Sequence, residues 1–228
     1  MKLLTFSLVG PLCSFGENSR WDHRDSAEMP TKSAVIGLLG CCFGWKRDDG
    51  RLRELNQKIH MAVRCERRGR LMTDYQTVQG ANGILLNAEH KRRPSDTIIT
   101  PRQYLQDAAF QVFLFGEEEA LMACEQAMSR PKWMAYLGRR SCPPTRPMLG
   151  QIIEMPSVEE ALRHWMDPRM KISRENLLKC EIEQEDGETK AGERLLVRRD
   201  TAIRADQNVY EERKVRAFMV KAGELACT

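Results

Sequence analysis

The stretch Met61-Ala62-Val63-Arg64-Cys65-Glu66-Arg67-Arg68-Gly69-Arg70-Leu71-Met72-Thr73-Asp74-Tyr75-Gln76-Thr77-Val78 decides the fold prediction. Met61, Val63 and Cys65 alternate with their neighbours in the period of two that is typical of a half-buried β-strand. The charged, glycine-containing segment over residues 66–70 is typical of a hairpin turn, so residues 71–78 are expected to return as a second strand.

Other elements are predicted on both sides of this hairpin. Before it we expect a strand over residues 3–9 and helices over 34–45 and 51–58, and after it a strand over 109–115 and a helix over 117–128. The order strand, helix, strand, strand, strand, helix predicts an α+β fold with a ferredoxin-like core of the kind found in RNA-recognition motifs. Such a fold does not by itself give a function.

Residues 79–102 interrupt the periodic pattern. They contain several glycines, the basic run His90-Lys91-Arg92-Arg93 and Pro94. A segment of this length without periodicity inside a compact domain is usually functional or disordered. We therefore expect an insertion that extends the central hairpin.

The last third of the chain is predicted to be rich in β-strands. Ser157 begins a capping box for a helix that ends near Trp165. We expect residues 177–183 and 195–200 to pair as a hairpin across an acidic turn, and residues 215–220 to form a last strand. The 228 residues, 42% of them hydrophobic, are expected to form a single domain.

Charge is segregated along the chain. The net charge is +4, but residues 46–70 carry nine basic and four acidic side chains, and residues 130–146 carry five basic side chains and no acidic one. This distribution indicates an anion-binding face. The eight cysteines include no C-x-x-C pair, so we expect small buried hydrophobic residues rather than disulfides. The sequence contains no zinc-ligand spacing, phosphate-binding P-loop or long apolar run. We therefore expect no metal, no cofactor and no contact with a membrane, and we expect a cytoplasmic location.

The loop Tyr136-Leu137-Gly138-Arg139-Arg140-Ser141-Cys142-Pro143 is the strongest functional candidate. Its glycine allows a bulky anion to approach the backbone, and adjacent guanidinium groups bind phosphate oxygens in bidentate fashion. The loop is therefore typical of a site for a phosphodiester backbone. The alternative is a solvated, proline-rich loop.

Several motifs follow one another along the first two thirds of the chain. They are Gly10-Pro11-Leu12, Pro30-Thr31-Lys32-Ser33, Gly37-Leu38-Leu39-Gly40, Arg47-Asp48-Asp49, Val63-Arg64-Cys65, Asp74-Tyr75-Gln76-Thr77-Val78, Tyr104-Leu105-Gln106-Asp107-Ala108-Ala109-Phe110 and the loop from Tyr136 to Pro143. In this order they resemble the CasD subunit family of type I-E CRISPR Cascade complexes. The match covers about residues 3–147 and fades beyond them.

The resemblance implies a non-catalytic, RNA-binding role in antiviral defence. Subunits of this family grip the 5′ handle of the CRISPR RNA (crRNA), cap a filament of backbone subunits and contact the large subunit. Contact with target DNA is then indirect, through the complex. The implied fold has a β-hairpin thumb, here at about residues 79–102, and a variable C-terminal part at about residues 151–228.

We expect the RNA-binding residues to supply phosphate ligands, a stacking ring and hydrogen-bond donors. Arg139 and Arg140 are the first candidates for phosphate contacts, and Tyr136 for stacking, with a core aromatic role as its alternative. The helix N-terminus at Lys32 and Ser33 is a candidate anion site, with simple capping as its alternative. The full set of candidates is Lys32, Ser33, Lys46, Arg47, Tyr75, Arg92, Arg93, Arg102, Tyr136, Leu137, Gly138, Arg139, Arg140 and Ser141.

Two other functions stay open at this point. In some CRISPR subtypes a relative of this subunit processes precursor crRNA as a metal-independent endoribonuclease. For this chemistry the chain offers His90 and Lys91 in the insertion, and His23, His60 and His164 elsewhere. The second alternative is a general RNA-binding protein outside CRISPR systems, which predicts specific RNA binding by the isolated chain.

Overall fold

The fold comprises ten strands and four helices in the part of the chain that the structure describes. This computed structural model describes residues 1–17, 23–80, 83–87, 89–93, 97–170, 176–184, 189–204 and 209–221. The elements are β1 (Lys2–Val9), β2 (Leu12–Cys13), α1 (Lys32–Phe43), α2 (Arg51–Lys58), β3 (Ile59–Arg67), β4 (Arg70–Gln79), β5 (Thr97–Gln106), β6 (Ala109–Gly116), α3 (Glu118–Ser129), β7 (Gln151–Glu154), α4 (Val158–His164), β8 (Leu177–Glu183), β9 (Arg194–Arg204) and β10 (Val209–Lys221).

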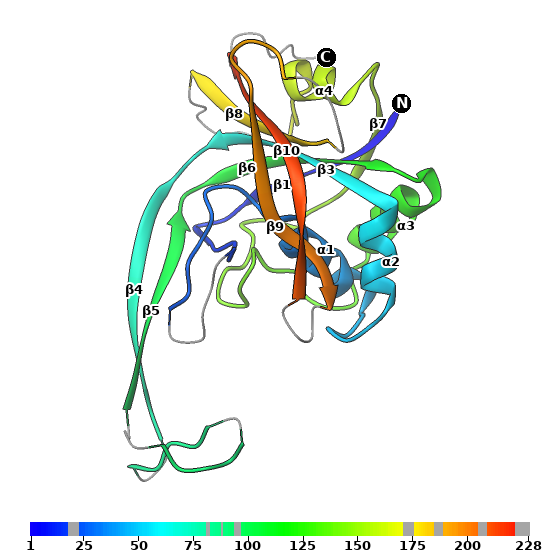
Figure 1. The fold of residues 1–228 in the computed structure, drawn as a ribbon. Coiled ribbons are helices and arrows are strands. Elements are labelled where there is room, and N and C mark those ends of the chain that lie inside the picture. The colour runs from blue at the N-terminus through cyan, green and yellow to red at the C-terminus, as the bar shows by residue number, and fades with distance from the viewer. Residues whose placement is uncertain are drawn as a thin grey trace.

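Seven strands form one large sheet in the order β7-β1-β6-β3-β8-β10-β9. Its neighbouring strands are antiparallel; β6, for example, pairs with both β1 and β3. A second sheet has the order β2-β5-β4 and consists mainly of the long β4–β5 hairpin. The result is a mixed α/β fold dominated by antiparallel pairing, as Figure 1 shows.

Helices cover both faces of the large sheet. Leu4, Phe6 and Leu8 of β1 face a core shared with α1 and α3, whereas Leu3 faces a second core shared with α4. This division follows from the alternation of side chains along a strand. Every side chain of β6 from Ala109 to Leu114 is buried, because this strand lies in the middle of the sheet and has a core on each side.

Most of the predicted elements before residue 130 are present, with shifts of no more than two residues at their ends. Thr31 is the N-cap of α1, and its side-chain oxygen accepts a hydrogen bond from the Ala34 N–H at 3.3 Å. Gly44 ends that helix with a φ of 75°. Ser157 caps α4 in the predicted way, since its hydroxyl accepts from the Glu160 N–H at 3.1 Å.

The predicted hairpin of residues 177–183 with 195–200 is wrong. Strand β10 lies between β8 and β9 and pairs with both. The sequence could not show this, because β10 is also amphipathic and alternation alone does not determine which strands are neighbours.

The β4–β5 hairpin extends away from the body of the molecule, as Figure 1 shows. Its register runs from Arg70 opposite Gln106 to Gln79 opposite Thr97. Residues 97–102, which the sequence analysis included in the aperiodic segment, therefore belong to β5. Exposed apolar side chains such as Leu71, Tyr75 and Ile99 lie along it.

A fully buried arginine joins α4 to the sheet. Arg64 on β3 donates through Nε to the Glu66 carboxylate at 2.8 Å and through its terminal nitrogens to the carbonyls of Leu162 and Trp165, at 2.7 and 2.9 Å. Carbonyls at a helix C-terminus have no partner within the helix, so a cation is favourable there. Arg64 thus fixes the end of α4 against the sheet.

Replacing Glu66 with Leu should destabilise the chain by about 3–5 kcal/mol, because it leaves the Arg64 charge buried without its carboxylate. Urea unfolding of the purified chain measures the change. The double replacement Arg64→Met with Glu66→Leu should be less harmful than Glu66→Leu alone. Glu154→Ala, at an exposed position on β7, should stay within about 0.5 kcal/mol of the parent. A loss for Glu66→Leu no larger than that of Glu154→Ala would contradict the assigned role.

Candidate nucleic-acid interface

A cavity of about 800 Å³ opens between α1 and the loop that follows α3. We call it the α1 groove. Its lining residues are Ser14, Gly16, Thr31, Ser33, Ala34, Ile36, Gly37, Gly40, Cys41, Trp45, Arg47, Leu52, Trp133, Met134, Ala135, Tyr136, Gly138, Arg140, Pro143 and Tyr210. Five of the predicted RNA-binding residues are among them, namely Ser33, Arg47, Tyr136, Gly138 and Arg140.

The side chains that line the groove are mainly basic, aromatic or small. They include two arginines, Arg47 and Arg140, and, within the described part of the chain, no acidic side chain. They also include four aromatic side chains, those of Trp45, Trp133, Tyr136 and Tyr210. Cations together with flat rings are the combination that single-stranded nucleic acids require, because the arginines bind phosphates and the rings stack on bases.

Two glycines of α1, Gly37 and Gly40, line the groove. A Cβ atom at Gly37 would meet nothing within 4 Å, so this position faces open space. At Gly40 a Cβ would lie 2.6 Å from Cδ2 of Leu52, so α2 packs closely against α1 at this glycine. The two glycines could not be told apart from the sequence. In the structure, Gly37 is the one of the two that leaves room for something outside the chain.

The predicted glycine loop is folded around its own backbone. Leu137 is buried in the core, its N–H donates to the Cys142 carbonyl at 2.8 Å, and its carbonyl accepts from the Ser14 N–H at 3.1 Å. The Gly138 N–H donates to the Tyr136 carbonyl at 3.1 Å. A Cβ at Gly138 would lie only 1.8 Å from the Ser14 carbonyl oxygen. The close approach that this glycine allows is therefore made by the Ser14 backbone, and the expected amide contact of Leu137 and Gly138 with RNA is not supported.

The two adjacent arginines have different environments. Arg139 points inward: its Nη2 donates to the carbonyls of Arg24 and Asp25, at 3.1 and 3.2 Å, and its Cζ lies 4.8 Å from the centre of the Tyr104 ring. Arg140 is exposed and lines the α1 groove. Arg140 is therefore available to a phosphate, whereas Arg139 holds the segment around residue 24 against β5.

Tyr136 is half-buried in the wall of the groove. Burial raises the pKa of its hydroxyl, an effect that the neighbouring Cys41 reinforces and Arg140 opposes. Ser141 is exposed next to this loop, and its hydroxyl lies 3.9 Å from the buried Cys142 sulfur. Ser33 lies at the other side of the groove, with its hydroxyl 3.3 Å from that of Thr31.

Lys32 does not reach the surface. Its side chain is only 4% exposed, and its Nζ lies 2.9 Å from the Glu183 carboxylate. Its backbone N–H donates to Asp200 Oδ2 at 2.7 Å, so a carboxylate of this chain already occupies the N-terminus of α1. The candidate anion site at the helix N-terminus is therefore occupied by an internal anion, and the buried Lys32 side chain is not accessible to a phosphate. Burial lowers the pKa of the Lys32 ammonium group, which Glu183 partly offsets.

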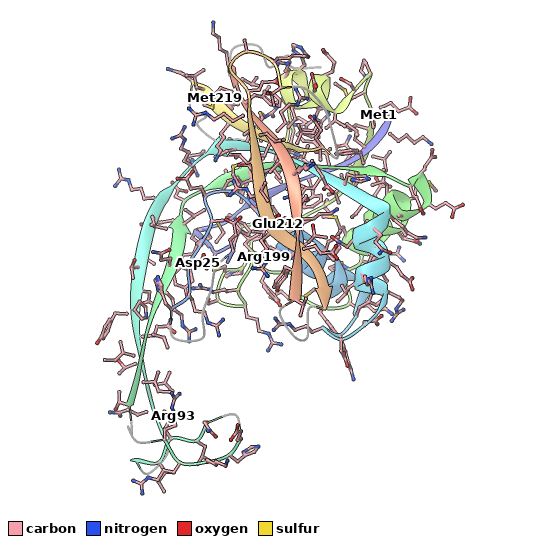
Figure 2. All side chains as sticks on the ribbon, viewed as in Figure 1. Met1, Asp25, Arg93, Arg199, Glu212 and Met219 are labelled. Atoms are coloured by element: carbon pink, nitrogen blue, oxygen red, sulfur yellow. The ribbon has the colours of Figure 1, made fainter. Side chains whose placement is uncertain are left out.

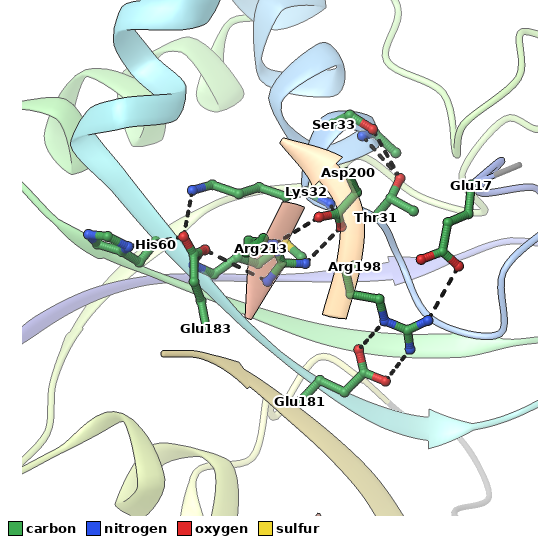
Figure 3. A network of polar contacts seen from close by, with 12 residues as sticks. Glu17, Thr31, Lys32, Ser33, His60, Glu181, Glu183, Arg198, Asp200 and Arg213 are labelled. Atoms are coloured by element: carbon green, nitrogen blue, oxygen red, sulfur yellow. Dashed lines mark hydrogen bonds and ion pairs between the residues drawn. The ribbon is translucent and has the colours of Figure 1, made fainter. Parts of the chain in front are cut away.

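Figure 3 shows that Lys32 belongs to a larger buried network that joins α1 to β3, β8, β9 and β10. Arg213 forms a bidentate pair with Asp200, at 2.9 and 2.7 Å. His60 Nδ1 lies 3.1 Å from Glu183, which also accepts from the Met61 N–H at 3.0 Å. Burial tends to raise the pKa of Glu183, but His60, Lys32 and Arg213 together lower it.

The remaining predicted residues lie outside the α1 groove. Lys46 is exposed just beyond α1 and does not line it. Tyr75 and Arg102 lie on the β4–β5 hairpin, where Tyr75 is 65% exposed. Arg92 and Arg93 belong to the end of the hairpin, and Figure 2 labels Arg93 there, far from Asp25 on the body. The structure thus separates a groove set from a hairpin set.

Sequence reasoning missed Trp45, Trp133 and Tyr210 as lining residues. Trp133 lies within the acid-free stretch that drew attention to the loop, so the sequence contained a signal for it. Tyr210 comes from the distant β10, and only the three-dimensional fold brings it to the groove.

In the described ranges, no group of three or more His, Cys, Asp or Glu side chains is arranged to hold a metal ion. None of the helices in the same ranges has the length and apolar character needed to cross a membrane. The cysteines described are free thiols, and burial raises the pKa of Cys13 and Cys124 to about 12.

Comparison with known proteins places this geometry in a family. The model of the family described as CRISPR-associated protein (Cas_Cas5) matches residues 3–218. The chain belongs to this family. It is also 35% identical, over 174 residues, to the CRISPR system Cascade subunit CasD of Escherichia coli (strain K12), a match that covers 71% of this chain and 76% of that protein. The resemblance to CasD that the sequence motifs indicated is confirmed.

Two solved structures share the fold of this Cas_Cas5 family member. One is a chain of a CRISPR RNA-guided surveillance complex, with a TM-score of 0.74, 26% identity, and coverage of 99% of this chain and 93% of that one. The other is a crystal structure of a Cas protein, with a TM-score of 0.68, 27% identity, and coverage of 99% and 98%. The likeness therefore includes the C-terminal strands, where the sequence motifs had faded.

Gly138→Ala should destabilise the chain by at least about 2 kcal/mol, because alanine at a φ of 85° is strained and its Cβ would overlap the Ser14 carbonyl. Gly192→Ala is the matched control: its φ is 88°, but a Cβ there would meet nothing within 4 Å. The control should lose only about 1–2 kcal/mol. Urea unfolding of both variants compares them, and equal losses would show that the contact with Ser14 is unimportant.

Proposed function

We propose that this chain is the subunit that grips the 5′ handle of crRNA in a type I-E CRISPR surveillance complex. In this role it caps the filament of backbone subunits, contacts the large subunit and reaches target DNA only through the complex. The observation that carries the proposal is the α1 groove in a chain of this family. Its described lining residues include two arginines and four aromatic rings and no acidic side chain.

The strand order supports the ferredoxin-like part of the proposal. Strands β7, β1, β6 and β3 are neighbours in that order, α1 and α2 lie between β1 and β3 in the chain, and α3 lies between β6 and β7. A split β-α-β unit has this arrangement. The β4–β5 hairpin is then the thumb, and the three C-terminal strands extend the sheet beyond β3.

The groove offers separate partners for each part of a nucleotide. The guanidinium groups of Arg47 and Arg140 suit phosphate oxygens, and the Ser33 hydroxyl can exchange hydrogen bonds with a ribose 2′-hydroxyl. These contacts hold the RNA without reading its bases. Gly37 leaves the helix backbone open to close approach by the RNA.

The subunit is proposed to bind RNA without cutting it. His60 is engaged with Glu183 and stacks on Phe115, and His164 lies 3.3 Å from Glu160. His90 lies at the end of the hairpin beside Lys91, whose ammonium group lies 3.0 Å from Glu89. Strand cleavage through a 2′-hydroxyl needs a base and a cation at one phosphate, and an exposed histidine whose cationic neighbour is paired to a carboxylate fits that chemistry poorly.

The double variant Arg47→Glu with Arg140→Glu should lose the RNA 5′ end and this subunit from the assembly. Native mass spectrometry of complexes made from a tagged chain, co-expressed with the neighbouring genes and a CRISPR array, measures the stoichiometry. With the purified chain and a labelled RNA of the repeat-derived 5′ sequence, the slope of log affinity against log salt should become shallower by about 1.4, or about 0.7 for each phosphate that is no longer neutralised.

The matched control is Arg194→Glu with Lys221→Glu. It changes the net charge equally. Both residues are exposed and lie at the open end of the β9–β10 hairpin, whereas Tyr210 lies at the other end of that hairpin. Its complexes should have the parental composition. Complexes carrying His90→Ala should contain crRNA with an unchanged 5′ end. Full occupancy by the groove variant would sink the proposal, and loss of RNA processing in the His90 variant would favour the endoribonuclease instead.

Gly37→Ala separates the groove from the stability of the helix. In the free chain it should stabilise by about 0.5–1 kcal/mol, because alanine favours a helix and the space beside Gly37 is empty. The same methyl group should weaken RNA binding, because it narrows the groove. Gln126→Ala, at an exposed position of α3, should leave RNA affinity unchanged. Unaltered RNA affinity in the Gly37 variant would exclude α1 as a wall of the RNA site.

A further inference from the structure

Trp133 is held rigidly at the rim of the α1 groove. Its backbone N–H donates to the Cys41 carbonyl at 3.2 Å, and the preceding Lys132 N–H donates to the Cys42 carbonyl at 2.9 Å. These bonds attach the loop to the C-terminal end of α1. The Trp133 side chain nevertheless remains 46% exposed and lines the groove.

Two of the other aromatic side chains in the groove already have partners in the chain. Phe43 stacks on Trp45 with a centroid distance of 4.2 Å and an interplanar angle of 7°, and the Arg51 guanidinium lies 4.8 Å from the same indole. Tyr136 is half-buried and interacts with Cys41 and Arg140 through its hydroxyl. The Trp45 ring is therefore already stacked and has a cation over it, and the Tyr136 ring is half-buried with its hydroxyl engaged inside the chain.

Trp133 differs from them. Within the residues that the structure describes, no aromatic ring stacks on its indole and no cation lies over it. The adjacent Met134 is 82% exposed, so two large apolar side chains next to each other contact water. An exposed apolar patch in a groove is typical of a binding site.

We propose that Trp133 is the platform on which one unpaired RNA base stacks. The inference rests on the proposed function, and it replaces Tyr136, the stacking residue expected from the sequence. An RNA occupant is favoured over a protein partner because, among the residues that the structure describes, the groove around Trp133 is lined by Arg47 and Arg140 and by no acidic side chain. A base needs a flat face and its phosphates need cations, and the groove provides both within one cavity.

Three replacements test the chemistry of the platform with the labelled repeat-derived RNA. Trp133→Ala should raise the Kd about fivefold to about 150-fold, the range expected for the loss of one stacked base. Trp133→Phe keeps a flat π face and should recover most of the affinity. Trp133→Leu keeps apolar bulk without a π face and should resemble the alanine variant. A leucine variant as tight as the phenylalanine variant would overturn stacking.

A scan with abasic nucleotides locates the base. Removing the stacked base should weaken binding to the parent chain as much as Trp133→Ala does, and the two changes together should weaken it no further. RNA binding should also quench tryptophan fluorescence in the parent, but much less in Trp133→Phe. The control is Trp165→Phe, which removes an indole that is buried against Phe113, and its quenching should match that of the parent. Additive losses at every abasic position would overturn the inference.

The failure of this inference can be distinguished from that of the proposed function. If Arg47→Glu with Arg140→Glu weakens RNA binding and Trp133→Ala does not, only the platform is wrong. If neither weakens binding, the groove is not the RNA site. If Trp133→Ala keeps its RNA affinity but loses another protein subunit from the complex, Trp133 is a protein contact and the inference is overturned.

Discussion

A buried set of ion pairs determines where the α1 groove can form. Asp200 of β9 binds the backbone N–H at the start of α1 and a guanidinium of β10, while Glu183 of β8 binds the Lys32 ammonium. These groups join the three C-terminal strands to the helix that forms one wall of the groove. Ionised groups with such low exposure are stable only when they are paired, so the strands and the helix must be placed together. The C-terminal part of the chain is therefore a structural requirement of the groove and not an appendage.

The cations around the α1 groove have different surroundings. Lys32, Arg64 and Arg139 are buried or half-buried and contact carboxylates or carbonyls of the chain itself. Arg47 and Arg140 line the groove, where the proposed function places a phosphate. Arg139 and Arg140 are neighbours in sequence, yet the turn at Gly138 sends one side chain inward and the other outward. An arginine pair in a sequence therefore does not indicate two phosphate contacts, because each side chain has its own environment.

Local patterns in the sequence were sufficient for the helices and for most strands before residue 130. Thr31 and Ser157 carry capping chemistry that depends on nearby residues only, and strands such as β6 are recognisable from continuous apolar runs. The placement of β10 between β8 and β9 depends on long-range pairing, which alternation cannot specify. The loop at Tyr136–Ser141 was identified as important, but Leu137 and Gly138 in it pack against the Ser14 backbone. No sequence pattern shows that two segments more than one hundred residues apart touch. Tyr210 was missed for the same reason, because it reaches the groove from a distant part of the chain.

The two hydrogen bonds that join Lys132 and Trp133 to the last carbonyls of α1 also determine how the groove responds to a ligand. They attach the loop wall to the helix wall, so the width of the groove is set before anything binds. In the proposed role, a preformed groove spares the protein the entropy of ordering its own loop, so that most of the ordering on association falls on the RNA, a flexible single strand. The groove should consequently impose its shape on the RNA strand rather than adapt to it. The positions of the other subunits along that strand would then be set by where this subunit holds its end.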